Sequence, residues 1–129
     1  MIKHSILEFP FIIIVDSNAP LVHVIAQYIA SLHLSLIKFT TYEKVFEFFE
    51  KHPRLVSLLI TNIGPNNEGE KLFHDITPDL WVGGKKLVIF TTGSDTKAEK
   101  FRNNGYCVIE KPYVHNVVVK IVSDALKTL

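Results

Sequence analysis

With 129 residues, of which 47% are apolar, the chain can bury the core of one domain and has no need of a second. Its 14 lysines and arginines against 13 aspartates and glutamates leave a net charge of +1, so charge gives no reason to expect nucleic acid or an anionic membrane as a partner. A single cysteine excludes an internal disulfide, and no apolar run is long enough to cross a bilayer, so we expect one cytoplasmic domain spanning residues 1–129.

Apolar periodicity divides the chain into alternating strands and helices. Continuous apolar runs rich in β-branched residues predict strands buried on both faces, and apolar residues three or four positions apart predict amphipathic helices. In chain order we expect a strand at 11–15, a helix from Ser17 or Asn18 to Leu32, a strand at 36–39, a helix from Thr41 to Pro53, a strand at 56–61, a short helix at 68–76, a loop containing Pro78, Trp81 and Gly83-Gly84, a strand at 87–90, a helix at 95–104, a strand at 106–109 and a helix at 114–125.

Alternating strands and helices predict an α/β fold. We expect a flavodoxin-like, doubly wound parallel sheet of five strands in the order 2-1-3-4-5, with helices on both faces. In such a sheet the carboxyl ends of the strands share one edge, where binding sites form. The polar residues that arrive there are Asp16, Thr61, Asn62, Thr91, Thr92 and Lys111.

This layout resembles the bacterial response-regulator receiver domain, the CheY-like module of two-component signal transduction and phosphorelays. The resemblance covers residues 10–129, and its most specific part is Lys111-Pro112-Tyr113, a Lys-Pro-aromatic step that opens an amphipathic helix. It implies two adjacent acids after the first strand, a phosphoacceptor aspartate after the third, a threonine or serine after the fourth and a lysine after the fifth.

Two of these acids are missing. Asp16 matches the first acid, but Ser17 stands where the family has the acid that binds magnesium directly, and Asn62 stands at the phosphoacceptor position. A gapless match that runs through to Gly69 puts Thr61 at that position instead. Neither alignment supplies a carboxylate, so the resemblance is to a degenerate pocket.

The remaining pocket positions are closer to the family pattern. Thr91 fits the threonine, with Thr92 as the alternative, and Lys111 fits the lysine. With one carboxylate left we expect no metal site and no cofactor, because magnesium binding is weak or lost. An amide oxygen at Asn62 is also a poor nucleophile, so no acyl phosphate forms there. We therefore expect a pseudo-receiver, not an enzyme, that acts through phosphorylation-independent protein–protein interaction.

Two structural expectations follow from the same residues. The retained Asp16 and Lys111 are expected to pair directly, in a partly buried contact worth more than a surface salt bridge. The Lys111-Pro112 bond is expected to be cis, as the resemblance implies and as an X-Pro step allows.

Other interpretations stay open. The chain can be an unconventional receiver that still accepts phosphate weakly, on Asp16 with a divalent ion; a flavodoxin-type nucleotide binder is less favoured, because no glycine-rich loop follows the first strand. The simplest interpretation of Asp16 is a helix cap, and of Cys107 an inert residue of a buried strand. The six histidines lack the spacing of a metal site.

A mean hydropathy of +0.22 suggests that some apolar surface remains exposed for a signalling partner or a second copy of the chain. The stripe from Val114 to Ala125 is expected to face the sheet. By resemblance, the interaction face lies on the helix at 95–104, the strand at 106–109 and the last helix. Its predicted apolar residues are Tyr106, Tyr113 and Val119, and its polar rim is Lys97 and Lys100.

Overall fold

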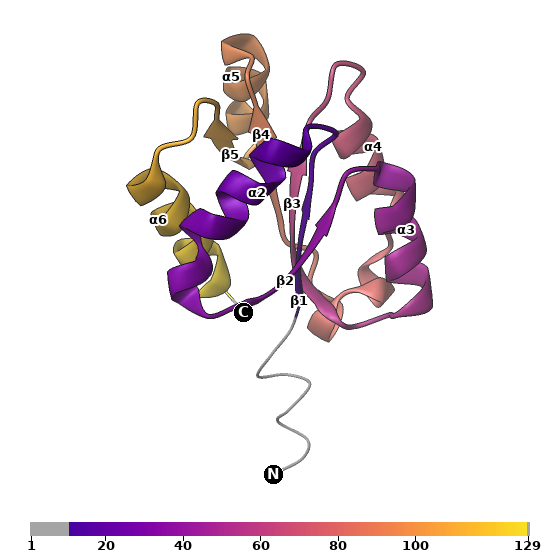
Figure 1. The fold of residues 1–129 in the computed structure, drawn as a ribbon. Helices are drawn as coiled ribbons and strands as arrows, with labels where there is room; N and C mark the ends of the chain where they lie inside the picture. Colours follow the sequence, from indigo (N-terminus) through magenta and orange to yellow (C-terminus); the bar gives the residue numbers. More distant parts are fainter. Residues whose placement is uncertain (1–10, 129) are drawn as a thin grey trace.

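The computed structural model describes residues 11–128 and has the predicted architecture (Figure 1). Five parallel strands form one sheet in the order β2-β1-β3-β4-β5. The strands are β1 (Phe11–Val15), β2 (Ser35–Phe39), β3 (Val56–Asn62), β4 (Val88–Thr92) and β5 (Cys107–Glu110). The flavodoxin-like fold class and the strand order are confirmed.

Helices cover both faces of the sheet. They are α2 (Ala19–Tyr28), α3 (Tyr42–Lys51), α4 (Glu68–Asp75), α5 (Asp95–Asn103) and α6 (His115–Leu126), with short 3-10 turns η1 (Ala30–Leu32), η2 (Pro78–Leu80) and η3 (Val82–Gly84). The buried residues of α2 and α6 pack in one cluster, and those of α3, α4 and α5 pack in another. Figure 1 shows α2 and α6 on one side of the sheet and α3 and α4 on the other. Over the described part of the chain, no helix has the length and apolar character needed to cross a bilayer.

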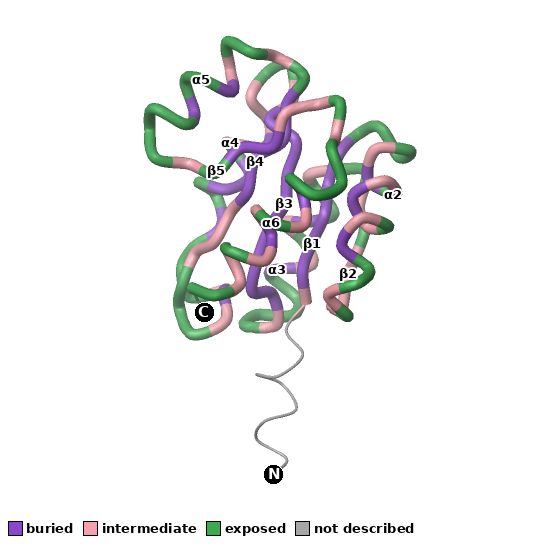
Figure 2. The backbone as a smooth tube through the Cα atoms, turned by 90° about the vertical axis from the view of Figure 1, so that its left-hand side faces the viewer, coloured by how far each residue is buried: buried purple, intermediate pink, exposed green. Residues whose placement is uncertain are grey.

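The two clusters explain why the central strands are apolar along their whole length. Side chains alternate between the faces of a strand, so Ile12 and Ile14 enter the α2–α6 cluster while Ile13 and Val15 enter the α3–α5 cluster. All residues of β3 are likewise buried. Figure 2 shows the central strands as the buried layer between more exposed helices. Burial on both faces removes the polar alternation that a half-exposed strand would show.

The first helix is shorter than predicted. Asn18 caps it, since its Oδ1 accepts a hydrogen bond from the N–H of Leu21 at 3.4 Å. The α-helix then ends at Tyr28, and the chain passes through η1 to His33, whose φ of 54° is left-handed. The left-handed His33 ends the 3-10 turn, because such a residue cannot continue a right-handed helix. Apolar periodicity alone did not distinguish the α-helix from the 3-10 turn that follows it.

Two burial predictions are wrong. Cys107 is exposed because it is the first residue of β5, an edge strand. The stripe on the last helix does not begin at Val114, because α6 starts one residue later and its fully buried valines are Val118 and Val122. Val114 and Val117 are 58% and 50% exposed.

Candidate functional site

Buried polar side chains gather where the carboxyl ends of the central strands meet, as predicted. They are Asp16, Thr61, Asn62, Thr91 and Thr92. Parallel register sets Thr61 beside Val15 and Asn62 beside Thr91. A pocket of about 220 Å³ opens above this edge, lined by Asn62, Gly64, Pro65, Thr92, Gly93, Ser94, Lys97 and Lys111.

The structure separates the two residues that compete for the third-strand position. Alternation along β3 puts Asn62 on the same face as Ile60, whereas Thr61 lies on the opposite face with Leu59. Thr61 is fully buried, and its hydroxyl donates to the Asn62 carbonyl at 3.0 Å. A Cβ on Gly69 would lie 2.0 Å from that carbonyl oxygen, so α4 packs directly over it. Asn62 lines the pocket and Thr61 lies beneath α4.

The two threonines of β4 also differ. Thr91 lies beside Asn62, whose Nδ2 donates to the Thr91 carbonyl at 3.1 Å and reaches the Thr91 Oγ1 at 3.5 Å. Thr92 lines the pocket, but its Oγ1 accepts a hydrogen bond from the N–H of Ser94 at 3.1 Å and so shapes the turn into α5. Thr91 is therefore the threonine in contact with the third-strand residue.

Asp16 and Lys111 form the predicted ion pair. The Lys111 Nζ donates to Asp16 Oδ2 at 2.9 Å, with 21% of the lysine side chain and 6% of the aspartate side chain exposed. The other oxygen, Oδ1, accepts from the N–H of Asn18 at 2.9 Å, so Asp16 also orders the turn into α2. Ser17 beside it is exposed. The Lys111-Pro112 peptide bond is cis, as predicted.

A second lysine reaches the pocket, and sequence reasoning placed it elsewhere. Lys97, expected on the rim of an outer face, donates from Nζ to the carbonyls of Gly64 at 2.7 Å and Pro65 at 3.2 Å. It lies in the first turn of α5, which Ser94 caps at 3.2 Å. Because that turn begins at the strand-end edge, a long side chain there reaches the loop after β3. The sequence did contain a signal for this placement, because Lys97 follows the helix-capping Ser94 by three residues and so lies in the first turn of α5.

Two tyrosines border the same edge. Burial raises the pKa of Tyr113 to about 12, and the charge of Asp16 adds slightly to this rise. A hydrogen bond with the Thr91 side chain lowers the pKa, but by less than burial raises it. Burial also raises the pKa of Tyr42 to about 12, helped by the charges of Asp16 and Glu68. The Tyr42 hydroxyl donates to the Asn62 carbonyl at 3.4 Å. Both phenols are therefore neutral hydrogen-bond donors at neutral pH.

The five residues predicted for an interaction face differ in burial and in the core cluster they pack against. Lys97 lies at the pocket, and Tyr113 packs with the α2–α6 cluster. Tyr106 packs with the opposite cluster, edge-on to Phe90 with ring centroids 5.2 Å apart. Val119 is half-buried and Lys100 is exposed. The interaction role of this face stays a prediction.

The pocket carries more positive than negative charge. Two ammonium groups, on Lys97 and Lys111, line it, and Asp16 is tied to one of them. In residues 11–128 no group of three or more histidine, cysteine, aspartate or glutamate side chains is placed to hold a metal ion.

Comparison with solved structures identifies the fold. The chain is similar to a response regulator receiver protein from Burkholderia phymatum, with 19% identity and a TM-score of 0.74 over 92% of this chain and 95% of that one. It is also similar to the signal receiver domain of an HD domain-containing protein from Pseudomonas fluorescens, with 22% identity and a TM-score of 0.74 over 93% and 96%. A response regulator from Thermotoga maritima matches with 14% identity and a TM-score of 0.74 over 92% and 98%. No family model and no curated protein matches the sequence. The fold is that of response-regulator receiver domains.

Proposed function

We propose that the chain is a receiver-like signalling module of the cytoplasm that acts through protein–protein interaction and without phosphorylation. The observation that carries this proposal is the identity of the residue at the end of β3. Asn62, an amide, lines the pocket and contacts Thr91, and this supports assigning it to the position where the receiver pattern has its phosphoacceptor carboxylate. A neutral amide oxygen is a poor nucleophile, and its phosphoryl adduct would not be an acyl phosphate.

The residues around Asn62 also do not fit the magnesium ion that the receiver pattern implies. Magnesium prefers several oxygen ligands in octahedral order and usually binds through carboxylates. The one carboxylate at this strand-end edge, Asp16, contacts the pocket residue Lys111, and both of its oxygens already accept hydrogen bonds. The carbonyls of Gly64 and Pro65 accept from the Lys97 ammonium. A divalent cation would have to displace these internal cations, so we propose a module without cofactor and without enzymatic activity.

The internal contacts of two lysines support a module held in one state. Lys111 joins β5 to the end of β1, and Lys97 joins α5 to the loop after β3. A phosphoryl group normally supplies new charge for such lysines to engage. Here both ammonium groups have partners within the chain, so the conformation that a partner recognises needs no modification.

The second candidate is a receiver that accepts phosphate weakly on Asp16. One observation favours it, because two lysines at the pocket would attract an anionic phosphodonor. Two observations argue against this candidate: Asp16 is buried, and both of its carboxylate oxygens accept hydrogen bonds. A phosphodonor therefore reaches the carboxylate poorly, and the carboxylate is a weaker nucleophile.

Incubation with acetyl phosphate and magnesium, followed by intact-mass measurement, decides between these candidates. We expect no added phosphoryl group. The Asp16→Asn variant is the matched control, because a phosphoryl group that appears on the native chain and disappears on this variant would establish the second candidate.

A further inference from the structure

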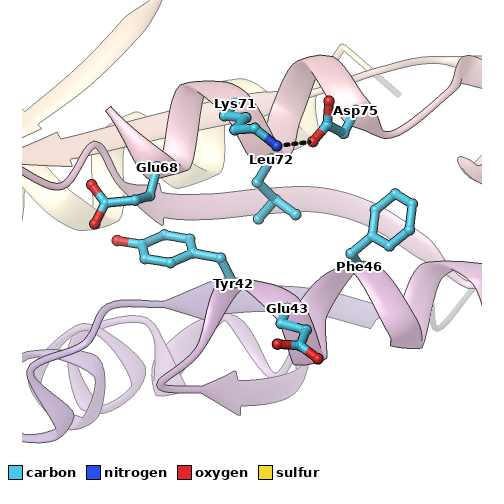
Figure 3. Close-up of a pocket in the computed structure, with 7 residues that line it drawn as sticks. All are labelled: Tyr42, Glu43, Phe46, Glu68, Lys71, Leu72 and Asp75. Atoms are coloured by element: carbon cyan, nitrogen blue, oxygen red, sulfur yellow. Dashed lines mark hydrogen bonds and ion pairs between the residues drawn. The ribbon is translucent and has the colours of Figure 1, made fainter. Parts of the chain in front are cut away.

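A groove lies between α3 and α4, away from the lysines of the strand-end pocket (Figure 3). Its volume is about 310 Å³. Its apolar surface comes from Tyr42, Phe46 and Leu72. In Figure 3, Phe46 and Leu72 extend from the two helices toward the space between them, and Tyr42 reaches toward Glu68 at one end.

Helical spacing explains how this groove forms. Tyr42 and Phe46 lie one turn apart on α3, so they present one side of that helix. Both are half-buried and pack against the α3–α5 cluster, while Leu72 on α4 is buried beneath them. The two helices thus leave an apolar trough that the described residues do not fill.

The rim of the groove is acidic. Three carboxylates line it, on Glu43, Glu68 and Asp75, against the single ammonium of Lys71. That ammonium is directed along its own helix, because its Nζ donates to Asp75 Oδ2 at 3.1 Å. The local charge is therefore negative in a chain whose formal net charge is +1.

We propose that this groove docks a basic amphipathic helix of a partner protein. Apolar side chains one turn apart on that helix fill the trough, and lysines or arginines beside them face Glu43, Glu68 and Asp75. This is the recognition mode in which an amphipathic helix lays its apolar face into a groove between two helices. The volume is at the small end of the range of about 300–1,000 Å³ for ligand pockets, which suits a few side chains rather than a large cofactor.

The groove also adjoins the loop that carries the pocket. A Cβ on Gly64 would lie 2.5 Å from Glu68 Oε1 and 3.3 Å from the Tyr42 hydroxyl, so these groove residues pack on the same turn whose carbonyl binds Lys97. The inference rests on the proposed role as an interaction module and adds the surface and the chemistry of the partner.

Fluorescence anisotropy with a labelled helical peptide tests this docking. The probe carries two leucines one turn apart with lysines on either side, and two control peptides replace the lysines with glutamates or the leucines with serines. We expect the probe to bind the native chain and both control peptides to bind at least about tenfold more weakly, a difference of about 1.4 kcal/mol. Binding should weaken as salt is added, because exposed charges are screened.

Two variants and a control locate the site. Glu43→Lys with Asp75→Lys reverses two exposed rim charges and should weaken probe binding about tenfold. Phe46→Ala should weaken it by removing part of the trough. Glu99→Lys reverses an exposed charge on α5, outside the groove, and should leave binding within about twofold of the native value.

Four results would overturn the proposal: no binding of the probe, equal binding of the glutamate peptide, native binding by the rim variant, or a concentration-dependent dimer that the rim variant abolishes. In the last case the occupant is a second copy, which would present its exposed Val114 and Val117. None of these results involves a phosphoryl group. If the chain does not bind the peptide and is also not phosphorylated, the docking groove is refuted and the proposed function stands.

Discussion

The strand-end pocket and the α3–α4 groove differ in how far their side chains are engaged within the chain. In the pocket, Asp16, Asn62, Lys97 and Lys111 each make hydrogen bonds to other residues. In the groove, Lys71 and Asp75 form an exposed pair, Glu68 accepts a hydrogen bond from the N–H of Asn66, and the apolar side chains of α3 and α4 border an open trough. A polar group whose hydrogen bonds are already formed within the chain has little capacity left to bind a ligand. The comparison indicates that the pocket stabilises the chain and that the groove is the better place for a partner.

The largest expected effect comes from breaking the Asp16–Lys111 pair. Lys111→Met should lower the free energy of unfolding by about 3 kcal/mol, because it leaves a buried carboxylate without its cation. Asp16→Asn combined with Lys111→Met should recover most of that loss, since no unpaired charge remains. Urea denaturation followed by circular dichroism measures both.

Lys120→Met is the matched control for this pair. Lys120 pairs with Asp124 at 3.0 Å, but 76% of the lysine and 51% of the aspartate side chain are exposed, so its loss should cost less than about 1 kcal/mol. Equal losses for Lys111→Met and Lys120→Met would show that the pocket pair contributes no more than a surface pair.

The next effect tests the packing of α4, which separates the two regions. Gly69→Ala would place a Cβ 2.0 Å from the Asn62 carbonyl oxygen and 2.8 Å from Thr61 Oγ1, so α4 must shift and stability should fall by about 2 kcal/mol. Gly93→Ala is the control, because its Cβ would meet nothing closer than Lys111 Cδ at 3.9 Å. Its change should stay within about 0.5 kcal/mol. Thermal unfolding compares them, and a Gly69→Ala chain as stable as Gly93→Ala would refute the close packing.

A smaller effect tests Lys97 as an internal cation. Lys97→Met removes hydrogen bonds to the carbonyls of Gly64 and Pro65 and should cost about 1 kcal/mol. Amide hydrogen exchange in the loop after β3 should become faster. Lys100→Met changes an exposed lysine of the same helix and should leave both quantities unchanged. Unchanged exchange in Lys97→Met would mean that the lysine does not hold this loop.

Most of the fold could be predicted from the sequence because its signals are local. Unbroken apolar runs mark the strands, and helical periodicity marks the helices between them. The errors lie where local patterns end. The α-helix ends at Tyr28 and is followed by a 3-10 turn that ends at the left-handed His33, and Cys107 is exposed by the edge position of β5. Edge position depends on the order of the whole sheet, which no short segment encodes.

The pocket could be predicted in part. The residues at strand ends were found because parallel strands share an edge, and the Asp16–Lys111 pair followed from their charges. Which of Thr61 and Asn62 lines the pocket depends on the alternation of side chains along β3 in the folded sheet. The reach of Lys97 and the groove between α3 and α4 both depend on how helices pack, which the sequence pattern does not specify.

The smallest effect compares the two tyrosines that border the strand-end edge, of which Tyr42 also lines the groove. Burial raises the pKa of both Tyr113 and Tyr42 to about 12, above the ordinary value of about 10. The folded chain therefore holds these phenol protons more tightly than the unfolded chain. The resulting stability is complete below about pH 10 and is lost as the pH rises through about 12.

Tyr113→Phe should flatten this alkaline loss more than Tyr42→Phe does, because Tyr113 packs with the α2–α6 cluster and Tyr42 borders the open groove. Solvent screening reduces the contribution of the half-buried Tyr42, so we expect a difference of less than about 1 kcal/mol between the variants. Urea midpoints at about pH 9 and about pH 11 measure it, and other groups that titrate in this range are common to both variants. If Tyr42→Phe flattens the curve more, the phenol at the groove is more strongly desolvated than the phenol packed with the α2–α6 cluster, and the description of the groove as open fails.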